Sequence, residues 1–173
     1  GDEYLVTEEG LSGRTTCFED PLHEGLSGLQ YITPCLKSHE FVDLLVIMLG
    51  TNDVKERFGS SAACVAIAMG RLVKKALATE CWGPNKPNVL VIAPPHIGEG
   101  MHSSPVGVTM GAGCAAKSRE LAHYYKIKAD LLGCHFMDAN GCEFNKIDFM
   151  HLTRNGHAQL AERFAALIPQ IVK

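Results

Sequence analysis

An aspartate and a histidine that can act as an acid–base pair lie near the end of the chain, in Asp148-Phe149-Met150-His151. In a loop, a carboxylate three residues before an imidazole can accept the Nδ1–H and fix the tautomer of the ring. The Nε2 atom is then free to take a proton from a nucleophilic hydroxyl. A plainer interpretation is that Asp148 or Thr153 caps the next helix and that the histidine is a surface residue.

A second polar group, Gly50-Thr51-Asn52-Asp53, follows directly after the most apolar run of the sequence. An asparagine amide at the end of a strand can donate an N–H to a developing oxyanion. Asp53 can accept backbone N–H bonds and hold the loop still. A simple turn or a helix cap would use the same residue types, so this group alone leaves both interpretations open.

A third group, residues 10–16, is rich in Gly, Ser and Thr. A glycine such as Gly13 lets the backbone approach a ligand closely and offer its N–H, although a plain turn has the same composition. Ser12 does not lie in a nucleophile elbow, because Arg14 stands where G-x-S-x-G requires glycine. The loop also fits neither phosphate-binding glycine motif, which argues against a nucleotide or flavin binder.

The elements that must position these groups are short apolar runs alternating with longer amphipathic stretches. We predict helices at 26–39, 60–81, 113–132 and 153–171, and strands at 4–7, 42–49, 88–93 and 135–137. The run 42–49 reads as a strand buried on both faces, and residues 96–112 as a long irregular loop that walls a substrate pocket. The alternation predicts one α/β domain, residues 1–173, with a parallel sheet covered by helices on both faces. Ligands of such sheets bind at the carboxyl ends of the strands, where the three polar groups lie.

Composition excludes several classes of protein. The net charge of -3 and the lack of basic clusters give no reason to expect a nucleic-acid partner. The longest apolar run, residues 44–49, is too short to cross a membrane. Seven cysteines without a C-x-x-C pair predict free thiols and a reducing compartment, the cytoplasm. His96 and His102 lack a third ligand at suitable spacing, so we predict no metal site.

The three groups, in this order, resemble the SGNH (GDSL-like) hydrolase superfamily. The segments EEGLSGRTT, IMLGTND and DFMHLTRNGHAQLAERF are similar to its arylesterase and acyltransferase branch. The resemblance implies a three-layer α/β/α sandwich with a flavodoxin-like parallel sheet. It also implies a serine ester hydrolase or acyltransferase that acts on short-chain acyl or aryl esters without a cofactor, and that forms a homo-oligomer.

The resemblance assigns roles residue by residue. His151 corresponds to the general base and Asp148 to the acid that orients it. The backbone N–H of Gly13 and the side chain of Asn52 correspond to the oxyanion hole, with Asp53 supporting the loop.

The family's opening strand, which ends in Gly-Asp-Ser and carries the nucleophile, has no counterpart here. Gly1-Asp2-Glu3 does not match it, because the six residues before Gly10 are too few for the intervening helix and strand. We therefore expect a segment of roughly 30–45 residues, the length of one strand with its crossover, to supply the central strand and the serine. The alternative is a non-catalytic binding protein of the same fold that has lost its nucleophile.

Overall fold

The computed structural model describes residues 3–172, so Gly1 and Asp2 of the opening tripeptide lie outside it. A three-stranded parallel sheet in the order β1-β2-β3 forms its centre. The strands are β1 (Leu45–Ile47), β2 (Val89–Ala93) and β3 (His135–Asp138). The helices are α1 (Gly28–Ser38), α2 (Ala62–Leu77), α3 (Gly107–Met110), α4 (Cys114–Leu132) and α5 (Arg154–Ile171), with 3-10 turns η1 (Glu56–Phe58) and η2 (Glu99–Ser103).

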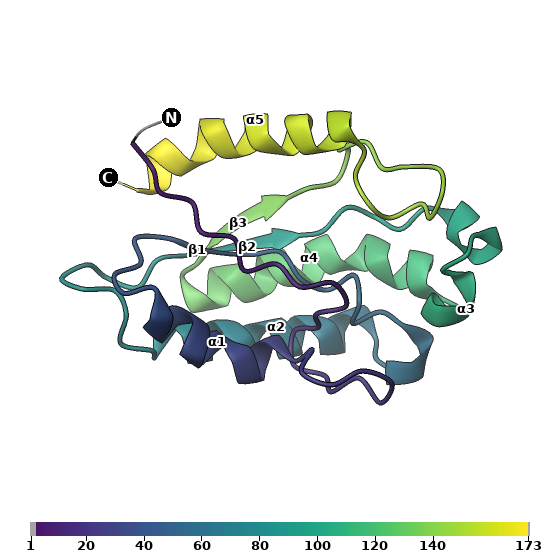
Figure 1. Cartoon of the computed structure of the whole chain (residues 1–173), viewed down its shortest axis with the longest axis horizontal. Helices are drawn as coiled ribbons and strands as arrows, with labels where there is room; N and C mark the ends of the chain where they lie inside the picture. The colour runs from purple at the N-terminus through teal and green to yellow at the C-terminus, as the bar shows by residue number, and fades with distance from the viewer. Residues whose placement is uncertain (1–2, 173) are drawn as a thin grey trace.

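Helices lie on both faces of this sheet. In Figure 1, α5 runs along one face, and α1, α2 and α4 lie on the other. Alternation along β2 explains why both faces are covered: Val89 and Val91 belong to the larger core cluster, whereas Leu90 and Ile92 pack with Leu160 of α5. The prediction of an α/β fold with a parallel sheet between helices is therefore confirmed.

Two of the long helices, α2 and α5, begin at a residue whose side chain accepts from one of the first N–H groups. The hydroxyl of Ser61 accepts from Cys64 N (3.2 Å) at the start of α2, and that of Thr153 accepts from Gly156 N (3.0 Å) at the start of α5. Ser27 makes no side-chain cap for α1, whose first N–H groups instead donate to the carbonyls of Thr15 and Thr16. The residues just after Gly13 are thereby fixed to α1.

The predicted strand at residues 4–7 is wrong. This segment has no regular secondary structure, and Leu5 and Val6 are 96% and 78% exposed. A strand is stable only when its backbone groups pair with a neighbour. Within residues 3–172 no strand lies beside this segment, so an apolar sequence alone does not make it a strand.

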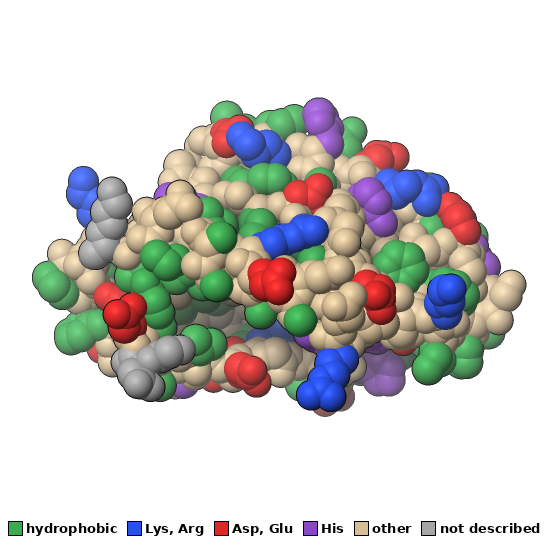
Figure 2. Space-filling view, turned by 90° about the horizontal axis from the view of Figure 1, so that it is seen from above, with side chains coloured by type: hydrophobic (Ala, Val, Ile, Leu, Met, Phe, Trp, Pro, Cys, Tyr) green, Lys and Arg blue, Asp and Glu red, His purple; other side chains and the backbone are tan. Residues whose placement is uncertain are grey.

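The strand predicted at 42–49 forms, but it is shorter and less covered than predicted. Only Leu45–Ile47 pairs with β2, and the other edge of β1 has no partner among the described residues. Ile47 is buried, whereas Val46 and Met48 on the opposite face are 38% and 39% exposed. Burial on both faces is therefore a wrong prediction for β1. Figure 2, seen from the α5 side, shows hydrophobic side chains gathered beside a hollow in this surface.

Residues 96–112 are not the irregular loop that the sequence predicts, because they contain η2 and α3. Met101 and Met110 from these short helices are buried in the larger core cluster, which gives the segment its regular structure. The seven cysteines are all unpaired, as predicted. None of the helices described here combines the length and the apolar character that crossing a bilayer requires.

We predict that Gly50→Ala destabilises the protein strongly. Gly50 has a φ of 128°, and an added Cβ would lie 2.5 Å from the Tyr125 hydroxyl, which donates to Leu49 O. Backbone strain and overpacking together should lower the free energy of unfolding by about 2–5 kcal/mol. Urea denaturation measures the change. Gly10→Ala is the matched control, because no atom lies within 4 Å of its added Cβ; equal losses in the two variants would refute the prediction.

Candidate active site

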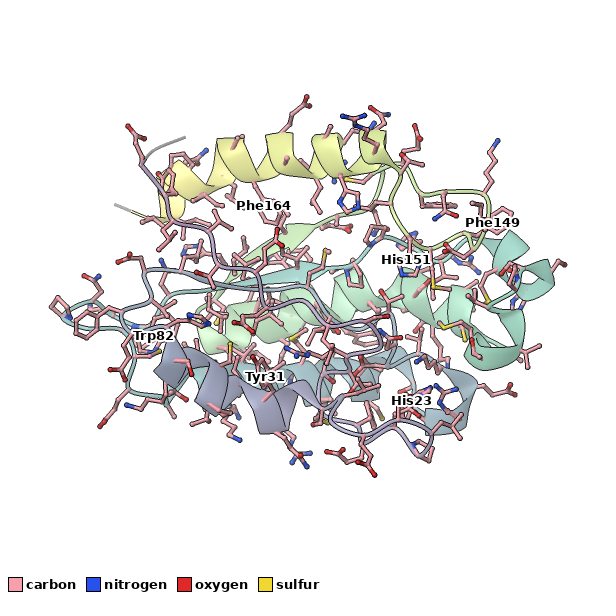
Figure 3. The ribbon with its side chains drawn as sticks, viewed as in Figure 1. His23, Tyr31, Trp82, Phe149, His151 and Phe164 are labelled. Carbon is pink, nitrogen blue, oxygen red and sulfur yellow. The ribbon has the colours of Figure 1, made fainter. Side chains whose placement is uncertain are left out.

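The predicted acid–base pair is present. His151 Nδ1 lies 2.8 Å from Asp148 Oδ2, and because the carboxylate can only accept, the Nδ1–H of the ring donates. The imidazole is exposed (72%), and its Nε2 has no hydrogen-bond partner within residues 3–172. Figure 3 shows His151 at the carboxyl-terminal end of the strands, where the loops converge. Thr153, and not Asp148, caps α5, so the capping interpretation applies to Thr153 alone.

The loop that carries this pair is held by its own hydrogen bonds. Asn145 Oδ1 accepts from the backbone N–H groups of Ile147 and Asp148, and Asn145 Nδ2 donates to His151 O. Phe149 adopts a φ of 61°, and its carbonyl accepts from Gly98 N at 2.8 Å. The loop before α5 is thus tied to the loop after β2. Asn145 was not predicted; its position three residues before Asp148 fits an Asx turn, which the sequence could have indicated.

Asp148 is held in its ionised form. Partial burial acts to raise its pKa, but the N–H groups of His151 and Met150 and the His151 ring donate to it and bring the pKa down to about 2. The carboxylate therefore keeps its charge at neutral pH. It can orient the His151 ring and stabilise the imidazolium that forms when Nε2 takes a proton.

Gly13 lies in a tight turn, and its amide is free. Arg14 N donates to Leu11 O (3.2 Å), and Gly13, with a φ of 84°, occupies the third position of the turn, where a positive φ is required. No group between residues 3 and 172 accepts the Gly13 N–H. Both interpretations of the glycine loop hold together: it is a turn, and the turn leaves one N–H available to a ligand.

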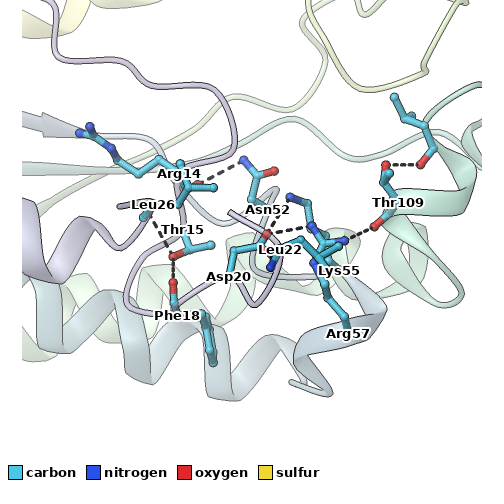
Figure 4. Close-up of polar contacts among 11 residues, drawn as sticks. Arg14, Thr15, Phe18, Asp20, Leu22, Leu26, Asn52, Lys55, Arg57 and Thr109 are labelled. Carbon is cyan, nitrogen blue, oxygen red and sulfur yellow. Dashed lines mark hydrogen bonds and ion pairs between the residues drawn. The ribbon is translucent and has the colours of Figure 1, made fainter. Parts of the chain in front are cut away.

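The side chain of Asn52 reaches the same turn. Asn52 Nδ2 donates one hydrogen to Arg14 O at 3.2 Å (Figure 4). A carboxamide nitrogen carries two hydrogens, so a second remains available for an oxyanion. The structure therefore brings the predicted oxyanion donors, Gly13 and Asn52, to adjoining positions through the carbonyl that follows Gly13.

Asp53 holds the turn that carries Asn52 against the glycine loop. Its Oδ1 accepts from both the backbone N–H (2.9 Å) and the hydroxyl of Thr16, so the turn after β1 is fastened to the glycine loop. The residue is fully buried, and its Oδ2 has no partner among the described residues. Burial outweighs the two hydrogen bonds and raises the pKa of Asp53 to about 6.

A further ion network supports these loops, and no pattern in the sequence predicts it. The buried carboxylate of Asp20 accepts from Arg57 Nη2 (2.8 Å) and lies 3.6 Å from Lys55 Nζ. Arg57 also donates to Thr109 O, in α3 (Figure 4). Contacts between residues so distant in sequence carry no local pattern, so only the folded chain reveals that the loop after Gly13 is joined to α3.

The site residues form two groups at one end of the sheet. Asn52 and Asp53 bond Arg14 and Thr16 of the loop that contains Gly13, and Asp148 bonds His151. One group follows β1 and the other follows β3, and the carboxyl ends of parallel strands share one edge. No hydrogen bond within the described part of the chain joins the two groups.

A cleft of about 650 Å³ lies next to the acid–base loop, between residues 95–100 and 140–149. His96, Glu99, Glu143, Lys146 and Phe149 line it. The backbone N–H of His96 donates to Asn140 Oδ1 (2.8 Å), and burial lowers the pKa of the His96 ring. The segment predicted to wall a pocket therefore does border a cleft.

Comparison with known proteins decides the family. The sequence profile of the GDSL-like Lipase/Acylhydrolase family matches residues 1–159. The chain belongs to this family. No curated protein matches the chain, but solved structures of similar proteins do.

Three solved structures similar to this family member carry esterase names. A carbohydrate acetylesterase from Sinorhizobium meliloti is 40% identical, with a TM-score of 0.83, over 96% of this chain and 80% of that one. The native aryl esterase of M. smegmatis is 35% identical, with a TM-score of 0.84 over the same shares of the two chains. A second S. meliloti structure, a carbohydrate acetylesterase family member, is 28% identical with a TM-score of 0.89, over 99% and 82%. The family resemblance inferred from the motifs is thus confirmed.

We predict that Asp53 makes this family member less stable as the pH rises. Because the pKa is about 6 in the folded state against 3.8 normally, the folded protein holds a proton between these values that the unfolded chain has lost. The free energy of unfolding therefore falls as the pH rises from about 4 to 6, by up to about 3 kcal/mol at 1.36 kcal/mol per pKa unit.

Urea denaturation of the 173-residue chain at several pH values between 4 and 7 checks this. In Asp53→Asn the loss of unfolding free energy caused by ionisation of residue 53 should vanish, so the variant gains stability relative to the wild type as the pH rises. Asp43→Asn, at an exposed carboxylate, should instead follow the wild type. Parallel curves of unfolding free energy against pH for all three proteins would show that ionisation of Asp53 does not destabilise the fold.

Proposed function

We propose that this chain carries the base, the orienting acid and the oxyanion donors of a serine ester hydrolase or acyltransferase. Its substrates are short-chain acyl or aryl esters of small molecules, and the nucleophilic serine of the Ser-His-Asp triad lies outside residues 1–173. Membership of the acylhydrolase family and the similarity to aryl and carbohydrate acetyl esterases support this proposal.

One observation carries the proposal: the exposed His151 ring donates Nδ1–H to an ionised Asp148 and leaves Nε2 without a partner. A histidine held in this tautomer has its basic nitrogen directed to solvent. It needs only a hydroxyl within hydrogen-bond reach to act as a general base. A capping or purely structural histidine has no need of the second nitrogen.

The mechanism follows from these groups. The serine Oγ attacks the ester carbonyl carbon while its proton passes to His151 Nε2. The carbonyl oxygen becomes an oxyanion, which the Gly13 N–H and the free hydrogen of Asn52 Nδ2 stabilise. Asp148 stabilises the imidazolium, which then returns the proton to the alcohol oxygen as the C–O bond breaks. Water or a second alcohol, deprotonated by His151, attacks the acyl-serine and releases the acid or a new ester.

Two features support a serine supplied by another segment. One edge of β1 has no partner in residues 3–172, and Val46 and Met48 on the uncovered face remain exposed. The buried Asp53 Oδ2, next to the glycine loop, also lacks a donor. A strand beside β1, followed by a turn near Asp53, would satisfy both. Such a strand would complete a three-layer, flavodoxin-like sheet within one domain.

Two predictions about the setting of the enzyme accompany this proposal. The seven unpaired cysteines support a reducing, cytoplasmic location. The homo-oligomer implied by the family resemblance stays a prediction, which sedimentation measurements can check.

We predict that a fluorophosphonate, which phosphonylates activated serines, labels the protein in a His151-dependent way. The protein should be expressed with the sequence that flanks these residues in its gene. His151→Ala should abolish labelling and lower kcat for p-nitrophenyl acetate by about 10⁴-fold or more, and Asp148→Asn by about 10⁴-fold. His157→Ala, an exposed histidine on α5, is the matched control and should keep full activity.

Peptide mapping of the labelled protein locates the nucleophile. A labelled serine outside residues 1–173 supports the proposal, whereas a labelled serine within them contradicts the proposed position. Neither label nor turnover would leave the non-catalytic binding protein as the better account.

We also predict that Asn52→Ala lowers kcat by about 10²–10³-fold with little change in KM. The amide bonds the oxyanion, which exists only in the transition state, so the loss falls on kcat. Steady-state kinetics with p-nitrophenyl acetate measure it. Asn85→Ala removes an exposed amide that donates to Asp43 and should behave as the wild type; a change in KM alone for Asn52→Ala would argue against an oxyanion role.

A further inference from the structure

A polar cluster outside the catalytic groups joins the segment before the glycine loop to α1. Glu9 Oε2 accepts from the Tyr31 hydroxyl at 2.6 Å, and Glu9 Oε1 accepts from His39 Nε2 at 2.6 Å. Tyr31, Cys35 and His39 follow one another at intervals of four residues, so they share one face of α1 and its C-cap (Figure 3 labels Tyr31). Both oxygens of a single carboxylate are therefore used to fasten residue 9 to the helix.

Arg14 makes the second attachment, on the other side of Gly13. Its guanidinium lies over the Tyr31 ring, 4.2 Å from the centroid, and its Nη1 donates to the backbone carbonyl of Glu9 at 3.0 Å. The turn that presents the Gly13 amide is thus held at both ends against the same tyrosine. The carbonyl of Arg14 also receives the Asn52 amide, so the attachment extends to the second oxyanion donor.

The charge of Glu9 strengthens this arrangement. The hydrogen bond from Tyr31, and after it that from His39, lower the pKa of the Glu9 carboxyl. Hydrogen bonds to an ionised carboxylate are stronger than neutral ones, which makes them effective in fixing a partly exposed segment.

The same cluster contains the ligand types of a zinc site, because atoms of Glu9, Cys35 and His39 lie within 4.8 Å of one another. Two contacts favour the hydrogen-bonded arrangement over a cation. Both Glu9 oxygens already accept hydrogen bonds, and bonds of about 2.0 Å from zinc to oxygen and nitrogen would force Glu9 and His39 apart from 2.6 Å. The Arg14 guanidinium adds a positive charge beside the cluster.

We propose that Glu9 is a positioning residue of the esterase: with Tyr31, His39 and Arg14 it clamps the turn that aims the Gly13 N–H at the oxyanion. This inference rests on the proposed function. It assigns catalytic importance to a residue that touches neither substrate nor the acid–base pair. Loss of the clamp lets the Gly13 amide move, and displacements on the scale of 1 Å are enough to cost a large part of kcat.

Kinetics of Glu9→Gln and Tyr31→Phe test the clamp. We expect kcat for p-nitrophenyl acetate, expressed per fluorophosphonate-reactive site, to fall on the order of 10-fold, with KM little changed. Glu8→Gln, at the exposed neighbouring carboxylate, is the matched control and should equal the wild type. Cys35→Ser should also keep kcat, because no hydrogen bond joins the thiol to Glu9, His39 or Arg14. Loss of activity in Cys35→Ser, with zinc bound to the wild type, would replace the clamp by a metal site.

Hydrogen exchange at the Arg14 amide, which donates to Leu11 O across the same turn, gives a readout that does not need turnover. By NMR, the exchange should be faster in Glu9→Gln than in Glu8→Gln, while amides in the core of α2 keep their rates. Equal Arg14 exchange in the two variants would overturn the clamp, as would a lower kcat that merely follows a lower melting temperature. If the wild type neither turns over nor is labelled, the proposed function fails, and the Arg14 exchange still decides whether Glu9 holds the turn.

Discussion

A buried carboxylate that joins two loops is the interaction on which this site depends. Asp53 accepts the N–H and the hydroxyl of Thr16, and so fixes the turn after β1 against the glycine loop. Asn52 then donates to the carbonyl of Arg14, the residue after Gly13. An oxyanion hole stabilises charge only if its donors are held in place before the reaction. Burying an ion with one unpaired oxygen is costly, and the raised pKa of Asp53 records that cost.

The unpaired edge and the exposed face of β1 lie in the strand that leads to Asn52 and Asp53. β1 pairs with β2 along one edge only. The face of β1 that carries Val46 and Met48 stays exposed, and the loop that follows this strand carries Asn52. The open edge, the unpaired Asp53 oxygen and the free Nε2 of His151 all fit a strand that ends in a hydroxyl-bearing turn. On the proposed function, a single additional element would complete both the sheet and the triad.

Elements and site residues that depend on interactions between near neighbours in the chain were predictable from the sequence. The apolar run at 88–93 and the caps at Ser61 and Thr153 depend on neighbouring residues, and the strand and helices formed where predicted. The pair Asp148–His151 was predictable for the same reason, being three residues apart in one loop. Predictions that needed a distant partner failed: residues 4–7 read as a strand but have none to pair with, and the Asp20–Arg57 contact has no sequence signal.

A crystal structure of the protein after phosphonylation of its reactive serine would test the proposed oxyanion hole directly. The phosphoryl oxygen stands where the oxyanion forms. This oxygen should lie about 2.7–3.1 Å from both the Gly13 nitrogen and Asn52 Nδ2, with His151 Nε2 facing the serine oxygen. A phosphoryl oxygen bound to other donors, or an imidazole of His151 turned to a different part of the molecule, would contradict it.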